Sequence, residues 1–488
     1  EKGRSLASAA GPHLFILTNF ITLSHRLYAK AMSTRPSIVW FRHDLRLGDN
    51  PALHEAISRG EGLILLYIHE EETGGTRPLG GASSWWLHHS LVSLRADVEK
   101  LGGELITRTG RPHDIISQLI QSTGAAAVFW NRRYGPARDG DQVLKAALRS
   151  QGVICESFGG NLLFEPWTIT TAQDQPFRVF TPFWRACLAA NPPRTPLAAP
   201  SSLTCTPGIT SEDIHHWALT PQGVDWSGGL AQMWTPGEQG AHRRLEDFVE
   251  NTLRYYHRRD EPGILSTSML SPHLRSGELS PHTVWDTLQQ VLPAGASENK
   301  AKFLSEIGWR EFSYNILFHF PHLQRDNYRE DFNRFPWGEA DPELLTAWQQ
   351  GRTGVPLVDA GMRELWHTGY MHNRVRMVTA SFLIKNLLVD WRVGEQWFWD
   401  TLVDADEANN PASWQWVAGS GADAAPYFRV FNPLLQAEKF DPDQIYIKKW
   451  IPEWGTDAYP SEAIIDLKAS RDRALAAFSS LKASRPEE

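Results

Sequence analysis

The sequence predicts two structural classes in one chain: an α/β domain with a Rossmann-like parallel sheet, followed by an all-helical domain. Two observations favour this division. Short apolar segments of strand length alternate with helix-period segments up to about residue 165, and after about residue 226 only the helical pattern continues. At 488 residues the chain is also too long for one small core, so more than one domain is expected.

Five apolar segments in the first part have the length and composition of buried strands. They are residues 37–41, 63–69, 104–110, 126–131 and 153–158. Between them lie four segments with helical spacing that end at or near a glycine, namely 50–60, 83–103, 113–124 and 140–152. Strands joined by helical crossovers predict a doubly wound parallel sheet. No G-x-G-x-x-G motif follows the first strand, so dinucleotide binding there has no support.

The strand pattern stops at residue 165, and a Pro-, Ser- and Thr-rich stretch follows at 191–208. Such a stretch predicts a long linker laid over the surface. We therefore expect four parts, which are an extension or leader at 1–36, an α/β domain at 37–165, a linker at 166–225 and a helical domain at 226–488. The apolar run at 13–23 mimics a signal peptide, but polar residues interrupt it, and Met32 fits a natural start.

Composition narrows the functional classes. The formal net charge of −8 argues against a protein that coats nucleic acid by bulk electrostatics, although it leaves room for a local basic patch. Three widely spaced cysteines exclude a disulfide framework and a four-cysteine iron–sulfur cluster, and a cytoplasmic location is expected. The sequence contains no run of 18 apolar residues, so no membrane-spanning helix is expected. The 21 tryptophans suggest stacking on an aromatic ligand, or a large helical core.

Two segments of the helical part combine polar groups in patterns that suit ligand binding. The stretch STSMLSPHLRSGELSP at 266–281 places hydroxyl groups before a helix, where they could bind phosphate or simply cap the helix. In SEIGWREF at 305–312, Glu306 and Trp309 share one helix face, as in a site that stacks on a flat ligand. A surface carboxylate beside a half-buried indole is the alternative, and the spacing alone favours it.

Two further segments carry the same kind of signal. In MHNRVRM at 371–377, Asn373, Arg376 and Met377 share a helix face that suits neither solvent nor an apolar core. An arginine paired with a nearby acid is the simpler explanation. The stretch LVDADEANNPASWQW at 402–416 gathers two acids, two amides and two indoles, but no further ligand follows at metal-binding spacing, so no metal site is expected. Together the four segments suit a pocket for a large flat cofactor bearing a pyrophosphate.

Five ordered motifs in this chain resemble the photolyase/cryptochrome family. They are WFRHDLRLGDNPAL (40–53), TSMLSPHLRSGELSP (267–281), WREF (309–312), TGVPLVDAGMRELWHTGYMHNRVRM (353–377) and DAAPYFRVFNPLLQAEKFDP (423–442). The resemblance spans residues 37 to about 480 and is strongest to bacterial class III cyclobutane pyrimidine dimer photolyases. It implies an N-terminal α/β antenna domain and a helical domain that holds a U-shaped FAD.

The resemblance also implies site residues. Those expected around the FAD phosphates and ribityl chain are Tyr255, Thr267, Ser268, Leu270 and Ser271, and those at the ribityl–isoalloxazine end are Arg310, Asn373, Arg376, Asp404, Asp406 and Asn410. Asn410 stands where photolyases face the flavin N5, and plant cryptochromes usually carry Asp there. Met269 departs from the family's common Thr-Ser-Arg triplet. For substrate contacts, the resemblance indicates Glu306, Trp309, Met377 and Trp416.

The implied activity is light-driven repair of damaged DNA. Excited reduced FAD would split a flipped-out cyclobutane pyrimidine dimer by electron transfer, and the dimer is favoured over the (6-4) lesion because Asn373 and Met377 stand where (6-4) photolyases carry histidines. The alternative is a cryptochrome-type photoreceptor without repair activity. Trp414, Trp391 and Trp337 align with the tryptophan chain that reduces the flavin, although one extra residue precedes Trp337. We expect a monomer whose antenna pigment is 5,10-methenyltetrahydrofolate rather than a deazaflavin.

Overall fold

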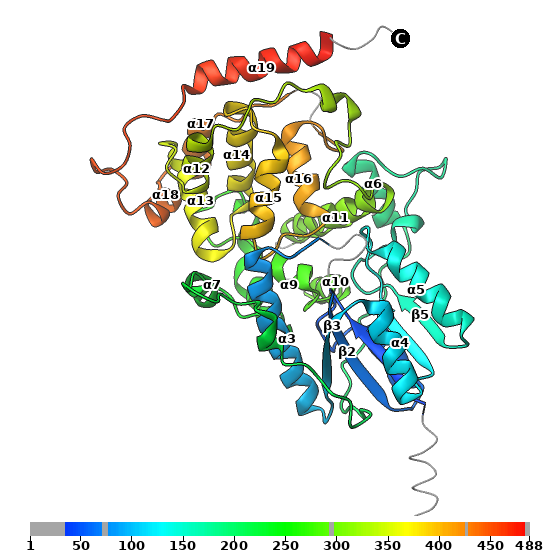
Figure 1. Cartoon of the computed structure of the whole chain (residues 1–488). Coiled ribbons are helices and arrows are strands. Elements are labelled where there is room, and N and C mark those ends of the chain that lie inside the picture. Colours follow the sequence, from blue (N-terminus) through cyan, green and yellow to red (C-terminus); the bar gives the residue numbers. More distant parts are fainter. Residues whose placement is uncertain (1–34, 71–76, 292–296, 425–427, 484–488) are drawn as a thin grey trace, which may run out of the picture.

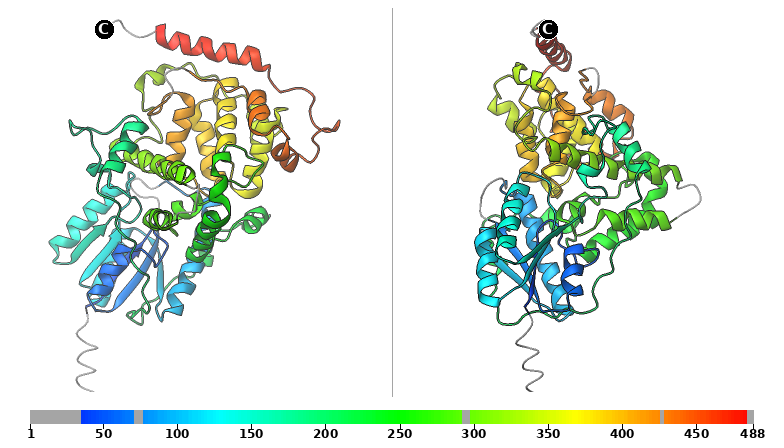
Figure 2. Two further views of the ribbon diagram at one scale, coloured as in Figure 1. Left: turned by 180° about the vertical axis from the view of Figure 1, so that it is seen from behind. Right: turned by 90° about the vertical axis from the view of Figure 1, so that its right-hand side faces the viewer.

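The computed structural model describes residues 35–70, 77–291, 297–424 and 428–483, so the expected extension at 1–36 lies almost entirely outside the described residues. A parallel sheet with flanking helices forms one end of the molecule, and a helical domain forms the other (Figure 1). The C-terminal helix α19 (Leu467–Ala483) lies at the end remote from the sheet in every view (Figure 2). In the described part of the chain, no helix is long and apolar enough to span a membrane.

The five expected strands are confirmed, each within one residue of its predicted bounds. They are β1 (Ser37–Phe41), β2 (Leu63–Glu70), β3 (Leu105–Gly110), β4 (Ala127–Asn131) and β5 (Ile154–Phe158). All four pairings are parallel, in the order β3-β2-β1-β4-β5. From β1 the chain adds β2 and β3 on one side, and then returns to add β4 and β5 on the other side. Ligands of doubly wound sheets bind beyond the carboxyl ends of the strands where the strand order reverses in this way.

Helices cover both faces of the sheet because the strands are apolar on both sides. Alternate residues such as Val39 and Leu65 pack against α2 (Pro51–Ser58) and α3 (Gly81–Lys100). Their neighbours, such as Ile38, face α4 (Pro112–Thr123) and α5 (Arg138–Ser150) instead. The four helical segments expected between the strands are thereby confirmed.

The helical domain is built from short and medium helices around two large apolar clusters. Its α-helices before α19 are α7 (Gly228–Met233), α8 (Glu238–Asp247), α9 (Ser271–Ser276), α10 (Pro281–Gln290), α11 (Ser297–His319), α12 (Pro342–Gln349), α13 (Pro356–Thr368), α14 (Asn373–Ser381), α15 (Trp391–Thr401), α16 (Asn409–Ala418), α17 (Pro433–Phe440) and α18 (Ile445–Trp450). π-helical turns occur at Phe248–Thr252 and Phe382–Asn386, and 3-10 turns occur at Leu253–Arg258 and Glu330–Arg334.

The predicted linker contains more structure than its composition suggested. Short 3-10 turns occur at Pro166–Thr168 and Ile214–Trp217, and α6 (Phe180–Ala189) lies between them. The buried residues of α6 belong to the same apolar cluster as α11, so this part of the linker is packed into the helical domain. The stretch at 191–208 has no helix, as expected, and it adds one bridge from Cys205 to Leu63 at the start of β2.

A buried arginine joins the two domains near the carboxyl end of β1. Arg46 donates to the carbonyl of Gly277, at the end of α9, over 2.8 Å. The same guanidinium donates to the carbonyls of Gly160 and Asp49 over 2.6 and 2.9 Å. A buried charge is tolerated where hydrogen bonds replace its hydration. These contacts therefore hold the helical domain against the carboxyl end of the sheet.

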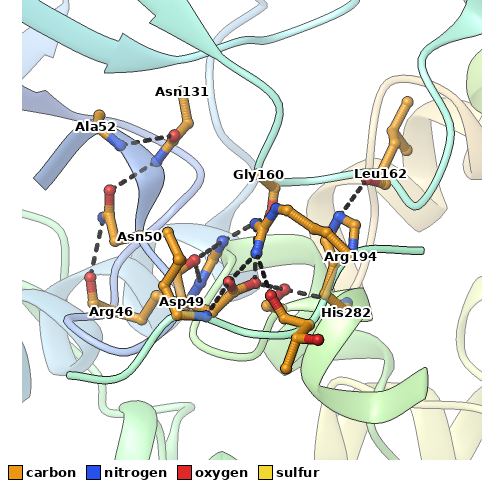
Figure 3. Close-up of polar contacts among 12 residues, drawn as sticks. Arg46, Asp49, Asn50, Ala52, Asn131, Gly160, Leu162, Arg194 and His282 are labelled. Atoms are coloured by element: carbon orange, nitrogen blue, oxygen red, sulfur yellow. Dashed lines mark hydrogen bonds and ion pairs between the residues drawn. The ribbon is translucent and has the colours of Figure 1, made fainter. Parts of the chain in front are cut away.

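Asp49 completes this interface, and Figure 3 shows its carboxylate facing Arg194 of the linker. It also accepts from the backbone N–H of Leu197 over 2.9 Å and from the hydroxyl of Ser280. Burial alone would raise the pKa of the Asp49 carboxyl, but the hydrogen bond from Arg194 and the charge of Arg46 outweigh it and lower that pKa. One carboxylate therefore links the α/β domain, the linker and the helical domain.

Glu311 predicts how the stability of the fold depends on pH. Its buried carboxylate in α11 accepts from the backbone N–H groups of Leu163 and Phe164 over 2.9 and 3.1 Å. Burial raises the pKa of Glu311 to about 7, and the nearby Arg310 opposes this only in part. A carboxyl whose pKa is higher in the folded state stabilises fully below its unfolded pKa and loses that contribution as the pH rises through 7.

We therefore expect Glu311→Gln to unfold at the wild-type temperature at pH 4 and at a higher temperature at pH 8. The free-energy difference at pH 8 should be on the order of 3 kcal/mol, at about 1.4 kcal/mol per pKa unit. Thermal unfolding at both pH values measures it, with Glu343→Gln on the exposed first turn of α12 as the control. An equal shift at both pH values would contradict this assignment.

Candidate functional site

A cavity of about 540 Å³ opens in the middle of the helical domain. Its walls come from α11, α14 and α16, together with the segment at 267–271 that leads into α9. Residues far apart in the sequence therefore meet here, including the four segments singled out by their polar patterns. Most of the predicted site residues line this cavity. They are Thr267, Ser268, Leu270, Ser271, Glu306, Trp309, Arg310, Asn373, Arg376, Met377, Asp404, Asp406, Asn410, Trp414 and Trp416.

The central charge pair of the cavity joins α14 to the turn before α16. Arg376 donates to both carboxylate oxygens of Asp404, over 3.1 and 2.8 Å, and its Nε donates to the carbonyl of Met371 over 2.6 Å. The hydroxyl of Ser271 donates to the same carboxylate over 2.6 Å. Although burial opposes its charge, the Asp404 carboxylate raises the pKa of Arg376. This bidentate pair fixes two walls of the cavity relative to each other.

Asp406 and Asn410 occupy the start of α16. The Asp406 carboxylate accepts from the backbone N–H of Ala408 over 2.8 Å and from the side-chain amide of Asn409 over 2.7 Å, which stabilises the helix start. The side-chain amide nitrogen of Asn410 donates to the Glu395 carboxylate over 2.8 Å, and Arg77 holds that carboxylate with two hydrogen bonds. The amide oxygen of Asn410 is therefore the end of the side chain left for a ligand.

Glu306 carries a negative charge that is already paired in this structure. Its Oε1 lies 2.6 Å from the guanidinium of Arg259 and 3.9 Å from the ammonium of Lys302. All three residues line the cavity. A carboxylate held beside two cations stays available as a hydrogen-bond acceptor for a polar N–H donor of a ligand.

Two half-buried indoles complete this side of the cavity. Trp309 belongs to α11, and one face of its ring is covered by Phe180, with ring centroids 3.9 Å apart and planes 11° apart. Trp416 belongs to α16, and its indole N–H donates to the carbonyl of Asp423 over 3.1 Å. Flat apolar faces of this kind suit stacked aromatic or pyrimidine-like ligands.

The heptapeptide at 371–377 forms the start of α14. His372 precedes the helix, and its Nδ1 accepts from the backbone N–H of Arg374 over 3.2 Å, as a helix-capping group does. Burial lowers the pKa of His372 to about 4, which keeps it neutral. Arg374 also lines the cavity, where it forms an ion pair with Asp260 over 2.9 Å. The stripe of Asn373, Arg376 and Met377 lies in the cavity wall, as expected.

Tyr255 is the one expected FAD contact that lies outside the cavity lining. Its side chain is 46% exposed, and the neighbouring Tyr256 lines the cavity instead. The π-turn at Phe248–Thr252 and the 3-10 turn at Leu253–Arg258 explain this placement, since both change the direction of side chains relative to a regular α-helix. Neighbouring residues in a 3-10 turn point about 120° apart, so a shift of one position exchanges an inward tyrosine for an outward one.

Met269, the departure from the family triplet, lies in the cavity wall with a positive φ of 53°. It is 7% exposed and packs in an apolar cluster with Trp85 and Tyr370. A residue other than glycine is uncommon in this conformation, so the surrounding packing must hold it there. The chain thus uses an apolar side chain at this position.

The three tryptophans expected to carry electrons share one apolar cluster. Trp414 lines the cavity, and Trp391 is fully buried, with its indole N–H donating to the side-chain oxygen of Asn327 over 2.9 Å. Trp337 is half-buried at the edge of the same cluster, where it contacts Phe335 at a ring distance of 4.4 Å. Trp414 therefore lies at the cavity, Trp391 in the core and Trp337 at the half-buried edge of the same cluster.

Sequence reasoning missed several charged and aromatic groups of the site. The lining includes Arg259, Asp260, Lys302 and Tyr370, of which none was singled out. Tyr370 lies inside a quoted motif, and Arg259 and Asp260 precede the hydroxyl segment by only a few residues. Lys302 is four residues before Glu306 on α11, a spacing that could have indicated their contact. The described residues contain no group of three metal-binding side chains.

Comparisons with known proteins agree with this geometry. Residues 37–201 match the family model described as DNA photolyase, and residues 303–465 match the FAD binding domain of DNA photolyase. The chain is 47% identical to the deoxyribodipyrimidine photo-lyase of Agrobacterium fabrum, over 93% of this chain and 99% of that protein. It is 38% identical to cryptochrome-1 of Arabidopsis thaliana, over 86% of this chain and 63% of that protein.

Solved structures give the same result. A bacterial class III photolyase from Agrobacterium tumefaciens superposes with a TM-score of 0.89 at 47% identity, covering 93% of this chain and 98% of the other. An archaeal photolyase from Sulfolobus tokodaii, described with two FAD molecules, superposes with a TM-score of 0.79 at 28% identity and covers 91% of this chain and all of the other.

Proposed function

This chain belongs to the DNA photolyase family, and from that membership and the cavity we propose that it repairs cyclobutane pyrimidine dimers in DNA by a light-driven reaction. The observation that carries this proposal is the placement of Glu306, Trp309, Met377 and Trp416 in the wall of one cavity with the charge pair of Arg376 and Asp404. A carboxylate and two indole faces suit a polar flat lesion, while the hydroxyl groups and the charge pair suit the cofactor.

The residues present fit FAD, because the cavity offers hydroxyl, guanidinium and carboxylate groups near one another. Thr267 and Ser268 would bind phosphate oxygens, and Asp406 and Asn410 would bind the polar edge of the ring. When bound in its reduced form, FAD supplies the photoexcited electron that opens the cyclobutane ring and then takes that electron back. Glu395 and Arg77 would keep the Asn410 amide in one orientation through their hydrogen bonds.

The lesion would enter the cavity out of the base stack, where its weakened pairing lowers the cost of flipping. Trp309 and Trp416 would provide stacking, which contributes ~1–3 kcal/mol per base in single-strand binders. The Glu306 carboxylate would accept a charge-assisted hydrogen bond from a lesion N–H and so hold the lesion in one position in the cavity. Asn373 and Met377 favour the cyclobutane dimer, because (6-4) photolyases carry histidines at these two positions.

Light-dependent repair of a dimer-containing oligothymidine tests this proposal directly. Recovery of thymine absorbance under blue light supports dimer repair, and its absence with fully reduced FAD would indicate the alternative, a photoreceptor related to the cryptochromes. We expect Glu306→Gln to lower the repair rate about tenfold, because a neutral amide accepts a weaker hydrogen bond from the lesion N–H than a carboxylate does. Its FAD absorbance should stay at the wild-type level.

The matched control for this substitution is Glu298→Gln, an exposed carboxylate on the first turn of the same helix. It removes the same charge from α11 at a position outside the cavity lining. Equal repair by Glu306→Gln and wild type would contradict the role given to Glu306. Loss of FAD together with repair would mean that Glu306 contacts the cofactor rather than the lesion.

We extend the proposal to the route by which electrons and light reach the cavity. Trp337, Trp391 and Trp414 would carry electrons from the surface to the flavin. A methenyltetrahydrofolate antenna would bind in the α/β domain, with a deazaflavin as the second candidate. The second chromophore described for the archaeal relative supports an antenna. A near-UV absorption band that appears when the purified protein is reconstituted with methenyltetrahydrofolate, and is absent without it, would identify the folate antenna.

The partner of this reaction is damaged DNA, and we propose that the protein acts on it as a monomer in the cytoplasm. The three cysteines are free thiols, which agrees with a reducing compartment. Size-exclusion chromatography with light scattering measures the oligomeric state. A dimer would contradict the proposed monomer and leave the repair activity open to the assay above.

A further inference from the structure

One short segment of the linker contacts Trp309 directly and Trp416 through Asp423, and these are the two indoles proposed to stack on the lesion. This segment, Arg178–Phe180, lies at the start of α6, which packs against α11 (Figure 1). It contacts Trp309 through a side chain and reaches Trp416 through the loop after α16. The proposed activity uses both indoles, but it assigns no role to this segment.

The contact with Trp309 is a parallel aromatic stack. The Phe180 ring lies 3.9 Å from the indole with planes 11° apart, and Phe180 itself is 9% exposed. Phe312 meets the same indole edge-on, at 5.8 Å and 78°. One face of Trp309 is therefore covered and its edge is supported, so a stacked ligand has only the opposite face, and the plane of that face is set by Phe180.

The contact with Trp416 passes through Asp423. The backbone N–H of Asp423 donates to the carbonyl of Arg178 over 3.2 Å, and its carboxylate accepts from the backbone N–H of Phe180 over 3.3 Å. The carbonyl of Asp423 in turn accepts from the Trp416 indole over 3.1 Å. Asp423 has a positive φ of 52°, a conformation that Asp and Asn tolerate better than most residues.

The loop needs one further feature to bring Asp423 close to the helix. A Cβ atom at Gly421 would lie 2.8 Å from the backbone nitrogen of Trp416, closer than such contacts are found. Gly421 also lines the cavity, so the loop returns along the wall that carries the indole. The Trp416 indole is thereby tied to the linker segment through Asp423, which hydrogen-bonds to the backbone of both Arg178 and Phe180.

The geometry points to Phe180 and Asp423 as positioning residues that set the distance and angle between the two stacking indoles, and so determine the shape of lesion that the cavity accepts. This inference rests on the proposed repair function. Phe180 and Asp423 act through Trp309 and Trp416. A lesion of two covalently joined pyrimidines has a fixed angle between its rings, so a change in the angle between the indoles should weaken binding of the dimer more than binding of an undamaged strand.

A double-mutant cycle in the FAD-loaded protein tests the first arm. Dissociation constants are measured in the dark for a dimer-containing oligothymidine and for its undamaged counterpart. We expect Phe180→Leu to weaken binding of the dimer strand about threefold to tenfold, the range typical of an aromatic pair, and to leave the undamaged strand within twofold. In a Trp309→Leu background the same Phe180→Leu change should have no further effect on the dimer strand.

Two variants separate positioning from general packing. Phe183 is a buried ring of the same helix, and its ring contacts are with Phe177 and Phe312 rather than with Trp309. Phe183→Leu should therefore leave dimer binding at the wild-type level. Phe180→Tyr keeps the ring and should restore wild-type binding. Additive effects of Phe180→Leu and Trp309→Leu, or equal losses for both strands, would overturn the inference while leaving the repair function intact.

Asp423 provides an independent arm that does not depend on how well the Phe180 variants fold. Asp423→Ala removes the acceptor for the Phe180 N–H and should weaken dimer binding, and Asp423→Asn should restore it, since the amide oxygen can accept the same hydrogen bond. Equal affinities of wild type and Asp423→Ala would overturn this arm. Failure of the wild type to prefer the dimer strand would overturn the proposed function, and this inference with it.

Discussion

Asp404→Ala should release the flavin and lower the free energy of unfolding by about 2–3 kcal/mol, less than the ~3–5 kcal/mol for a fully buried ion pair because the Arg376 side chain is 24% exposed. Arg376 would then keep its charge in the cavity wall without the carboxylate that now holds it over 2.8 Å. The hydroxyl of Ser271 would lose its acceptor as well. FAD absorbance after gel filtration and thermal unfolding of the FAD-free protein measure the two effects separately.

The double variant Asp404→Ala with Arg376→Met sharpens this expectation. Removing both charges avoids an unpaired, half-buried cation, so the double variant should unfold at a higher temperature than Asp404→Ala alone. Asp443→Ala, at an exposed carboxylate before α18, is the control for loss of one acid from the helical domain. Wild-type flavin content in Asp404→Ala would show that this carboxylate does not contribute to the cofactor site.

The second large effect concerns electron supply. Trp391→Phe should abolish the light-driven reduction of bound flavin, because phenylalanine keeps the apolar packing but is much harder to oxidise than an indole. Repair by protein whose flavin has been reduced chemically should continue, since Trp391 lies outside the cavity lining. The measurement is the loss of oxidised-flavin absorbance under blue light with an external electron donor.

Trp399→Phe is the matched control for this change. Trp399 is also a buried tryptophan of α15, but its indole N–H donates to the carbonyl of Pro78 and it lies outside the expected route. Photoreduction should remain in this variant. An equal loss in both variants would point to a packing effect, and a wild-type rate in Trp391→Phe would mean that electrons reach the flavin by another path.

The strands could be predicted from the sequence because a parallel sheet buries both of its faces, which leaves continuous apolar runs such as 63–69. The helix α6 could also have been found. Phe180, Phe183, Trp184 and Cys187 follow helical spacing, but the Pro-rich stretch after them drew the whole region into one linker. Composition over a long window therefore hid a short periodic signal.

The site residues could be predicted where short motifs carry several of them together. The contacts between motifs could not, because no local pattern encodes them. The pairing of Glu306 with Arg259 and the hydrogen bonds from Arg77 through Glu395 to Asn410 join segments far apart in the sequence. The placement of Tyr256 rather than Tyr255 in the cavity lining follows a π-turn that no motif in the sequence indicates.

The buried contacts of Arg46 have a consequence for light collection. Energy passes between two pigments at a rate that depends steeply on their separation and on the angle between their transition dipoles. Domains joined only by a flexible tether would average over many angles. Arg46 and Asp49 join the carboxyl end of the sheet to Gly277 and Ser280 of the helical domain. Any pigment carried by the α/β domain would therefore keep one orientation toward the flavin. The fold itself would then set the efficiency of energy transfer.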